Sequence, residues 1–397
     1  MIINSKVFPS IQADPNYTGP DNDDAQHVIL EFNSVYISQQ ATSEYCSQND
    51  SFYLQILNDG SIRKFLLSSF ISKDIISKIV RGDLLLIIDN CMEVSEYLVD
   101  VIYEELVIKQ GIPAKQIVLV TGSSDITSRV FEISAKLKQD RIKLECFNIS
   151  EKVIQGNISL LAAELKQYRR TKPTKVYTTF NRRWRPHRIA MLGLLYGRNL
   201  LQYGNVSFGK TSSIDSNPIG DWDGQYDKLI EEFKDTVIHE QLIAGKNAGS
   251  LLPLQLDLSE PPSNRFTLDR QAIGFYTKSI ISLVNETCYD SEYRIRFLTE
   301  KVFKPVSCMT PFIIASTPYY LELFRECGYK TFSPFIDESY DSEPDDAKRL
   351  NLIVNEVERI CKMTPIEQDQ LLINLEPIVR HNFEVLTQRR NFIQRLI

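Results

Sequence analysis

The stretch that decides the fold runs from Ser279 to Ala315 and reads SIISLVNETCYDSEYRIRFLTEKVFKPVSCMTPFIIA. The near-continuous apolar run at 280–284 is typical of a parallel strand covered on both faces, and Glu286 closely follows it. Thr299 is a suitable N-cap for a helix, and a second apolar strand at 311–315 follows that helix. The order strand, helix, strand predicts a parallel unit of an α/β fold.

Charged side chains gather where this predicted helix begins. Lys301 and Lys304 lie one turn apart, and a helix N-terminus beside lysines attracts phosphate through its N–H groups and the positive charge. Glu300, at the same place, suits hydrogen bonds from ribose hydroxyls. The combination predicts a nucleotide-sugar site. The structural alternative is that these charges only complement the helix dipole and form a solvated face.

The residues at 299–303, TEKVF, are followed by a small-residue turn and by PFI at 311–313. This pattern resembles the donor-binding motif of fucosyltransferase-type enzymes, which are two-domain glycosyltransferases of the GT-B architecture. The resemblance implies that Glu300 and Lys301 bind the ribose and phosphates of the donor. It covers the last third of the chain. The identity of the sugar is not carried over, because the sequence departs from the fucosyltransferase pattern elsewhere.

Length and composition narrow the class of protein. A chain of 397 residues favours two domains, and 43% hydrophobic with 24% charged residues is ordinary for a soluble globular enzyme. A net charge of −6 argues against nucleic acid as a partner. The chain has no run near the ~18 apolar residues of a membrane span, and its first residues lack the order of a secretory signal. Seven cysteines without CxxC spacing predict a cytoplasmic protein, with peripheral association at the inner membrane face left open.

The chain pattern predicts two Rossmann-like domains that face each other across a cleft, as in the GT-B architecture. Arginines, a lysine and Pro173 mark a boundary. We therefore expect an acceptor-side domain at 1–172 and a nucleotide-sugar-binding domain with C-terminal helices at 173–397. The predicted strands lie at 83–89, 117–122, 142–147, 175–180, 205–209, 280–284, 311–315 and 329–332.

A basic turn, NRRWRPHR at 181–188, lies between a predicted strand and a predicted helix. The carboxyl edge of an α/β sheet is where such proteins bind anions, and arginine grips phosphate or carboxylate with paired donors. We expect Arg182 and Arg183 to clamp a diphosphate or an acidic sugar, with Arg185 or Arg188 allowed to face solvent. The alternatives are a solvated face with structural ion pairs, or a patch for a polyanion or a membrane surface.

His187, in the same turn, is a candidate general acid or base. Its charged form should be disfavoured by the surrounding arginines, so orientation or hydrogen bonding to a phosphate is the role that the sequence favours.

The candidates for the catalytic carboxylate are Asp223, Asp221 and Glu286. An inverting glycosyltransferase needs one carboxylate as a base, and a double-displacement enzyme needs one as a nucleophile. The two aspartates lie in a polar, glycine-containing segment, whereas Glu286 ends the strand of the donor site. The alternative for Asp223 is a helix cap.

The acidic run DESYDSEPDD at 337–346 invites a metal site, since hard cations bind clustered carboxylates. Its spacing fits no calcium loop, and Pro344, Asp345 and Asp346 look like the start of a helix. We therefore expect neither a metal nor another cofactor. Basic groups would then stabilise the departing nucleotide.

The sequence thus predicts a metal-independent glycosyltransferase that moves a sugar from a nucleotide-sugar donor to a glycan or glycolipid acceptor, in lipopolysaccharide or capsule biosynthesis. A bacterial β-Kdo transferase using a CMP-linked acidic sugar is one specific form. A catalytically silent nucleotide- or sugar-binding module is the first alternative. The second is a nucleotide-sugar-modifying enzyme on a doubly wound fold, although no Gly-x-Gly-x-x-Gly fingerprint follows a predicted strand.

Overall fold

The computed structural model describes residues 51–55, 66–91, 96–160, 172–181, 184–209, 222–254, 256, 270–292, 296–389 and 393–395. By its contacts the chain divides into two compact units, Met1–Val153 with Arg390–Ile397, and Ile154–Arg389. Both units combine helices with a largely parallel sheet, which confirms an α/β fold. The predicted domains at 1–172 and 173–397, and the cleft between them, stay predictions.

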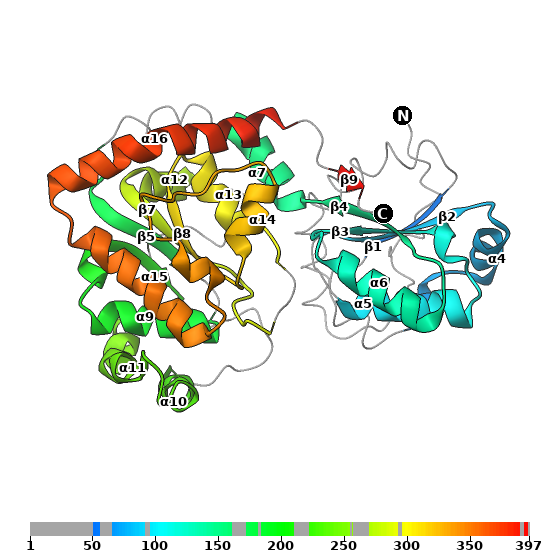
Figure 1. Ribbon diagram of the computed structural model, residues 1–397, viewed down its shortest axis with the longest axis horizontal. Coiled ribbons are helices and arrows are strands. Elements are labelled where there is room, and N and C mark those ends of the chain that lie inside the picture. Colours follow the sequence, from blue (N-terminus) through cyan, green and yellow to red (C-terminus); the bar gives the residue numbers. More distant parts are fainter. Residues whose placement is uncertain are drawn as a thin grey trace. The chain divides into compact units, whose positions relative to one another are not determined.

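The first unit contains a sheet whose described strands follow the order of the sequence. Its elements are β1 (Ser51–Gln55), η1 (Leu67–Phe70), α4 (Lys73–Arg81), β2 (Leu85–Asn90), α5 (Glu96–Val101), η2 (Ile102–Lys109), η3 (Ala114–Gln116), β3 (Ile117–Thr121), α6 (Ile126–Leu137), β4 (Lys143–Phe147) and β9 (Ile393–Arg395). The order is β1-β2-β3-β4-β9, parallel except for the β4–β9 pair. Right-handed connections that always step in one direction leave their helices on one face, as Figure 1 shows for α5 and α6.

The second unit begins within α7 (Ile149–Leu160) and contains the other sheet. Its elements are β5 (Lys175–Asn181), α9 (Pro186–Gly197), η4 (Leu201–Tyr203), β6 (Gly204–Phe208), α10 (Trp222–Glu232), α11 (His239–Gly245), η5 (Lys246–Leu251), α12 (Arg270–Thr277), β7 (Ser279–Asn285), α13 (Glu300–Ser307), β8 (Phe312–Ala315), α14 (Tyr320–Glu326), η6 (Ser339–Ser342), α15 (Asp346–Cys361) and α16 (Pro365–Gln388). All neighbouring strands of this sheet are parallel.

The winding direction reverses in the middle of this second sheet, whose order is β6-β5-β7-β8. From β5 the chain passes through α9 to β6 on one side, and from β7 it passes through α13 to β8 on the other. The carboxyl ends of β5 and β7 therefore flank a topological switch point. Open α/β sheets bind their ligands at such a point.

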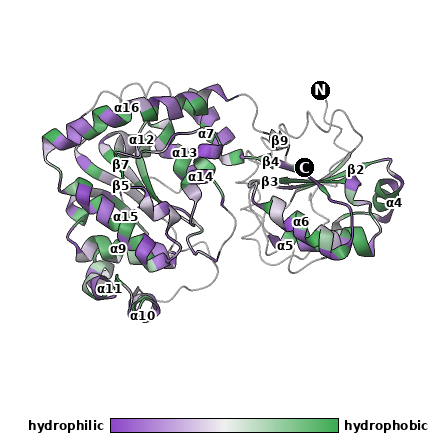
Figure 2. Cartoon of the chain, in the orientation of Figure 1, coloured by the Kyte–Doolittle hydropathy of each residue, from purple (hydrophilic) through white to green (hydrophobic). Residues whose placement is uncertain are grey.

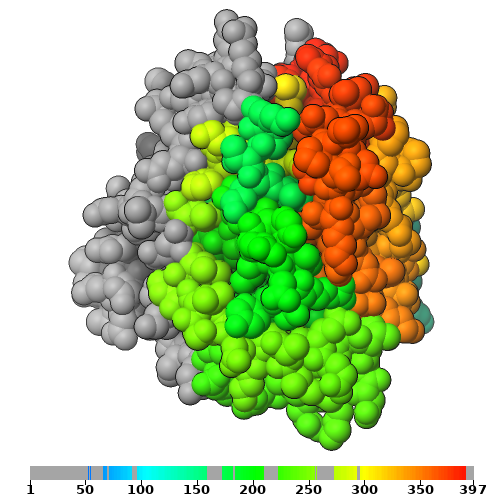
Figure 3. Space-filling view, turned by 90° about the vertical axis from the view of Figure 1, so that its left-hand side faces the viewer, coloured from blue at the N-terminus to red at the C-terminus, as the bar shows by residue number. Residues whose placement is uncertain are grey.

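Helices cover both faces of the second sheet. Helices α9 and α15 pack together on one face, whereas α12, α13 and α16 lie over the other (Figure 1). Figure 2 shows hydrophobic and hydrophilic bands alternating along α15 and α16, as expected for amphipathic helices, and Figure 3 shows both helices beside the green segment that begins near residue 172. Strand β7 is buried along its whole length, as its apolar run predicts.

The predicted strand at 329–332 is wrong, because the structure forms no strand there. The side chain of Asn382 on α16 accepts a hydrogen bond from the Lys330 N–H and donates one to the Lys330 carbonyl, each at 2.8 Å. An amide side chain from a distant helix therefore satisfies backbone groups that a neighbouring strand would otherwise satisfy.

Candidate functional site

The carboxylate of Glu286, directly after β7, is the centre of a buried hydrogen-bond network. The Thr299 hydroxyl lies 2.8 and 2.7 Å from its two oxygens, the Tyr320 hydroxyl donates to it at 2.8 Å, and the Lys301 ammonium lies 3.6 Å away. Burial and the charge of Glu286 raise the pKa of Tyr320 well above its ordinary value, so this phenol stays a donor. These four residues, here called the Glu286 network, join β7 to the starts of α13 and α14.

Local hydrogen bonds shape the start of α13. Thr299 is the N-cap, as predicted, and its hydroxyl accepts from the Lys301 N–H at 3.2 Å. The Lys301 ammonium lies 3.1 Å from Glu300 Oε1. Burial opposes ionisation of Glu300, but the charges of Lys301 and Lys304 outweigh it and hold the pKa of Glu300 below its ordinary value. Glu300 is therefore an ionised hydrogen-bond acceptor at neutral pH.

The start of α9 meets the same place from the β5 side. His187 Nε2 donates to the Glu286 carbonyl at 2.9 Å, and Arg188 Nη2 donates to the Asn285 and Glu286 carbonyls at 3.0 and 2.9 Å. Burial, followed by the charge of Arg188, lowers the pKa of His187 to about 3. The charged form of His187 is disfavoured, as predicted, although burial contributes more than the arginines do, and its hydrogen bond is with the backbone. Arg188 is only 5% exposed, so of the two arginines allowed to face solvent only the partly exposed Arg185 can do so.

A stacked column of three side chains supports this corner. The Tyr289 ring stacks on His187, with ring centres 4.9 Å apart, and the Arg349 guanidinium lies 4.2 Å from the centre of the Tyr289 ring. Arg349 is 1% exposed and donates to the carbonyls of Ser316 and Glu343. The column ties α9 and α15 to the loop that follows β7.

Sequence reasoning missed three of these residues, Tyr289, Tyr320 and Arg349. For Arg349 a signal existed, because it lies four residues before Ile353 and therefore on the buried face of α15. No comparable local pattern marks the two tyrosines, whose partners lie far away in the sequence.

Asp223 lies on a different side of the same sheet edge. It is exposed in the first turn of α10, next to Trp222. The Trp222 ring packs edge-on against Trp184, with centres 5.8 Å apart, and Trp184 belongs to the turn between β5 and α9. The Trp222 ring also lies 6.2 Å from that of Phe208, the last residue of β6, so Asp223 in the first turn of α10 lies near the carboxyl ends of β5 and β6. The predicted site residues Arg182, Arg183 and Asp221 lie outside the residues that the structure describes.

The acidic run at 337–346 is used within the protein. Asp345 caps α15 by accepting from the Lys348 N–H at 2.9 Å, which confirms the predicted helix start. Asp341 Oδ1 accepts from the Leu321 N–H at 2.9 Å. Across the described part of the chain, no three His, Cys, Asp or Glu residues are grouped to hold a metal ion. Among the described helices, none is both long and apolar enough to cross a membrane.

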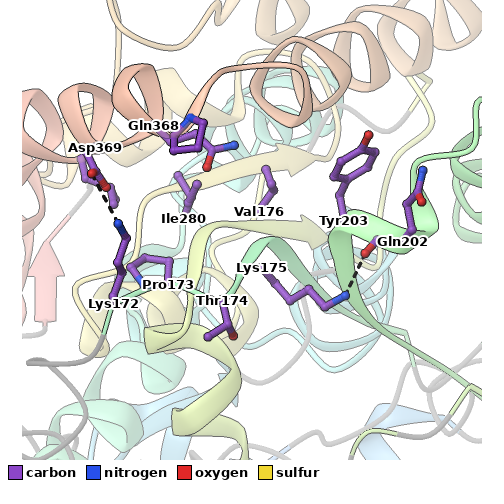
Figure 4. Close-up of a pocket in the computed structure, with 12 residues that line it drawn as sticks. Lys172, Pro173, Thr174, Lys175, Val176, Gln202, Tyr203, Ile280, Gln368 and Asp369 are labelled. Carbon is purple, nitrogen blue, oxygen red and sulfur yellow. Dashed lines mark hydrogen bonds and ion pairs between the residues drawn. The ribbon is translucent and has the colours of Figure 1, made fainter.

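A pocket of about 190 Å³ lies at the opposite, amino-terminal edge of the second sheet (Figure 4). The start of β5 and the first turns of α16 line it. Its two lysines already have partners, since Lys172 Nζ lies 3.6 Å from Asp369 and Lys175 Nζ donates to the Gln202 carbonyl at 2.8 Å. Parallel sheets bind ligands at their carboxyl edge, so the Glu286 network is the stronger candidate site.

No known protein family matches the chain, and no curated protein matches it. Among solved structures, the N-terminal domain of a trehalose-6-phosphate phosphatase from Candida albicans aligns with a TM-score of 0.36 and 8% identity, over 79% of this chain and 72% of that chain. A trehalose-6-phosphate synthase, OtsA, aligns with a TM-score of 0.36 and 13% identity, over 83% of this chain and 74% of that chain. Likenesses this loose do not bear on what this chain does.

Proposed function

We propose that this protein is a glycosyltransferase that binds a nucleotide-sugar at the carboxyl edge of β5 and β7. The observation that carries the proposal is the Glu286 network, which holds the start of α13 and its Glu300–Lys301 pair at the switch point of the sheet. In this proposal the acceptor is a glycan or glycolipid. The protein acts in the cytoplasm, and the transfer of the sugar needs no metal ion. The role in surface polysaccharides and the acidic sugar remain predictions from the sequence.

Different groups at the start of α13 bind different parts of the donor. Glu300 is ionised and accepts hydrogen bonds from the ribose hydroxyls. The Lys301 ammonium lies within 4 Å of two carboxylates, which offset its charge. In this proposal the rest of the positive charge for the diphosphate comes from Lys304, from the N-terminus of α13, and from Arg182 and Arg183, which follow β5 in the sequence.

In this proposal Glu286 positions the start of α13, and another carboxylate is the catalytic base. The side chain of Glu286 is 2% exposed, and its two oxygens already accept from Thr299 and Tyr320. A carboxylate in that state has little freedom to take a proton from an acceptor hydroxyl. Asp223 is exposed at the same edge and is the proposed base, with Asp221 as the second candidate.

Replacing Glu300 or Lys301 with alanine is expected to weaken nucleotide binding about tenfold or more, because a hydrogen bond to a charged group contributes roughly 1.5–3 kcal/mol. Isothermal titration calorimetry with UDP, GDP, CMP and dTDP measures this loss. The control variants are Lys172→Ala and Glu376→Ala. Lys172 is exposed at the opposite edge of the sheet and Glu376 is exposed on α16, so both variants should bind the nucleotide as tightly as the wild type does. Unchanged affinity in both site variants would remove α13 from the donor site.

Replacing Asp223 with asparagine is expected to lower turnover by at least ~100-fold, the lower range for acid–base catalysis, and to leave nucleotide affinity nearly unchanged. The matched control is Asp227→Asn, one turn further along α10, where Asp227 pairs with Lys246 at 2.6 Å. Near-normal turnover in Asp223→Asn would move the base to Asp221. A wild-type protein that binds nucleotide but neither transfers nor hydrolyses the sugar would favour the silent binding module.

A further inference from the structure

An exposed tyrosine stands beside the Glu286 network. Tyr319 lies between β8 and α14 and is 51% exposed. No ring contact or side-chain hydrogen bond joins Tyr319 to any residue that the structure describes. The next residue, Tyr320, is 1% exposed and donates to Glu286 at 2.8 Å. The fold therefore buries one of two adjacent tyrosines and leaves the other about half exposed.

The backbone of Tyr319 is in the left-handed region, with φ 62° and ψ 22°. Glycine and asparagine adopt this conformation readily, whereas a bulky side chain there is strained. Two contacts hold it, because the Tyr319 N–H donates to the Asp341 carbonyl at 2.6 Å and the Tyr319 carbonyl accepts from Arg296 at 3.3 Å. Strain of this kind clusters at functional sites. Since glycine would serve the backbone better, the fold alone does not account for the ring.

The same contacts place Tyr319 next to the proposed donor site. Arg296 lies three residues before Thr299, the N-cap of α13, and so ties Tyr319 to the loop that enters this helix. On the other side, Tyr320 bonds to Glu286, whose carboxylate lies 3.6 Å from the Lys301 ammonium. The path from Tyr319 to Lys301 therefore runs through the next residue, Tyr320, and the carboxylate of Glu286.

We propose that Tyr319 is the platform on which the base of the bound nucleotide stacks. This inference rests on the proposed nucleotide-sugar site and adds the residue that receives the base. Aromatic side chains stack on any nucleobase, because every base has a π face. The ring therefore contributes affinity, and the choice among bases comes from other groups.

The test compares variants that keep or remove the ring. The nucleotide used is whichever of UDP, GDP, CMP and dTDP the wild type binds most tightly. Tyr319→Phe keeps the ring, so its affinity for this nucleotide should stay within about twofold of that of the wild type. Tyr319→Gly removes the ring and should lose about fivefold to a hundredfold in affinity, the range that base–aromatic stacking provides. Its melting temperature should equal or exceed that of the wild type, because glycine relieves the strained φ.

Two further variants keep the result interpretable. Tyr319→Asn also tolerates positive φ and should repeat the loss of affinity if Tyr319→Gly folds poorly. Tyr203→Ala removes a tyrosine, 37% exposed, from the opposite edge of the sheet and should leave affinity unchanged. Wild-type affinity in both ring-removing variants overturns the platform, whereas the donor site still stands if Glu300→Ala loses affinity. A wild-type protein that binds none of the four nucleotides overturns both proposals.

Discussion

Replacing Arg349 with alanine is expected to lower the free energy of unfolding of the second unit by about 3–5 kcal/mol, because three carbonyls lose a charged donor and each buried polar group left unsatisfied costs about 1–3 kcal/mol. Arg349 donates to the carbonyls of Ser316, Glu343 and Tyr289 and pairs with Asp346 at 2.5 Å. The truncated side chain would leave three carbonyls and one carboxylate without this donor, together with a cavity under the Tyr289 ring.

Urea denaturation followed by tryptophan fluorescence measures this loss in the relevant unit. The chain has two tryptophans, Trp184 and Trp222, and both belong to the second unit. The control is Arg380→Ala on α16, where the 61% exposed arginine pairs with Glu376 one turn away, and its effect should stay within about 0.5 kcal/mol. A loss below about 1 kcal/mol for Arg349→Ala would show that the stacked column does not support the site.

The stability of the second unit is expected to fall as the pH rises from about 4 to about 6, through Asp341. Burial raises the pKa of Asp341 from 3.8 to about 6. Below pH 4 the carboxyl is protonated in both states, whereas between pH 4 and 6 the folded protein keeps a proton that the unfolded chain has released. At about 1.4 kcal/mol for each pKa unit, ionising this group costs the folded state about 3 kcal/mol by neutral pH.

The variant Asp341→Asn tests this contribution, because asparagine keeps an oxygen that accepts from the Leu321 N–H. The free energy of unfolding of the variant minus that of the wild type should rise by about 3 kcal/mol between pH 4 and pH 7. Asp369→Asn, at a carboxyl that is 55% exposed, corrects for the change in net charge. A difference that does not change with pH would mean that Asp341 ionises as easily in the folded protein as in the unfolded chain.

Elements with a strong local pattern were predictable from the sequence. The apolar run at 280–284 became β7 (Ser279–Asn285), and the run at 311–315 became β8 (Phe312–Ala315). The N-cap at Thr299 was predictable for the same reason, since a cap depends on the residues that follow it directly. The predicted strand at 329–332 was wrong, because the backbone of Lys330 bonds to the side chain of Asn382, about fifty residues away in the sequence, where no local pattern can indicate it.

By itself, the sequence determined the α/β class and the grouping of Thr299, Glu300 and Lys301 at one helix start, because alternation, capping and adjacency act over a few residues. Only the tertiary structure decided that both oxygens of Glu286 accept hydrogen bonds and that Arg188 is buried. The physical reason is that burial and hydrogen-bond partners depend on which strands become neighbours. In this sheet the reversal between β5 and β7 brings the starts of α9 and α13 together, although about a hundred residues of chain separate them.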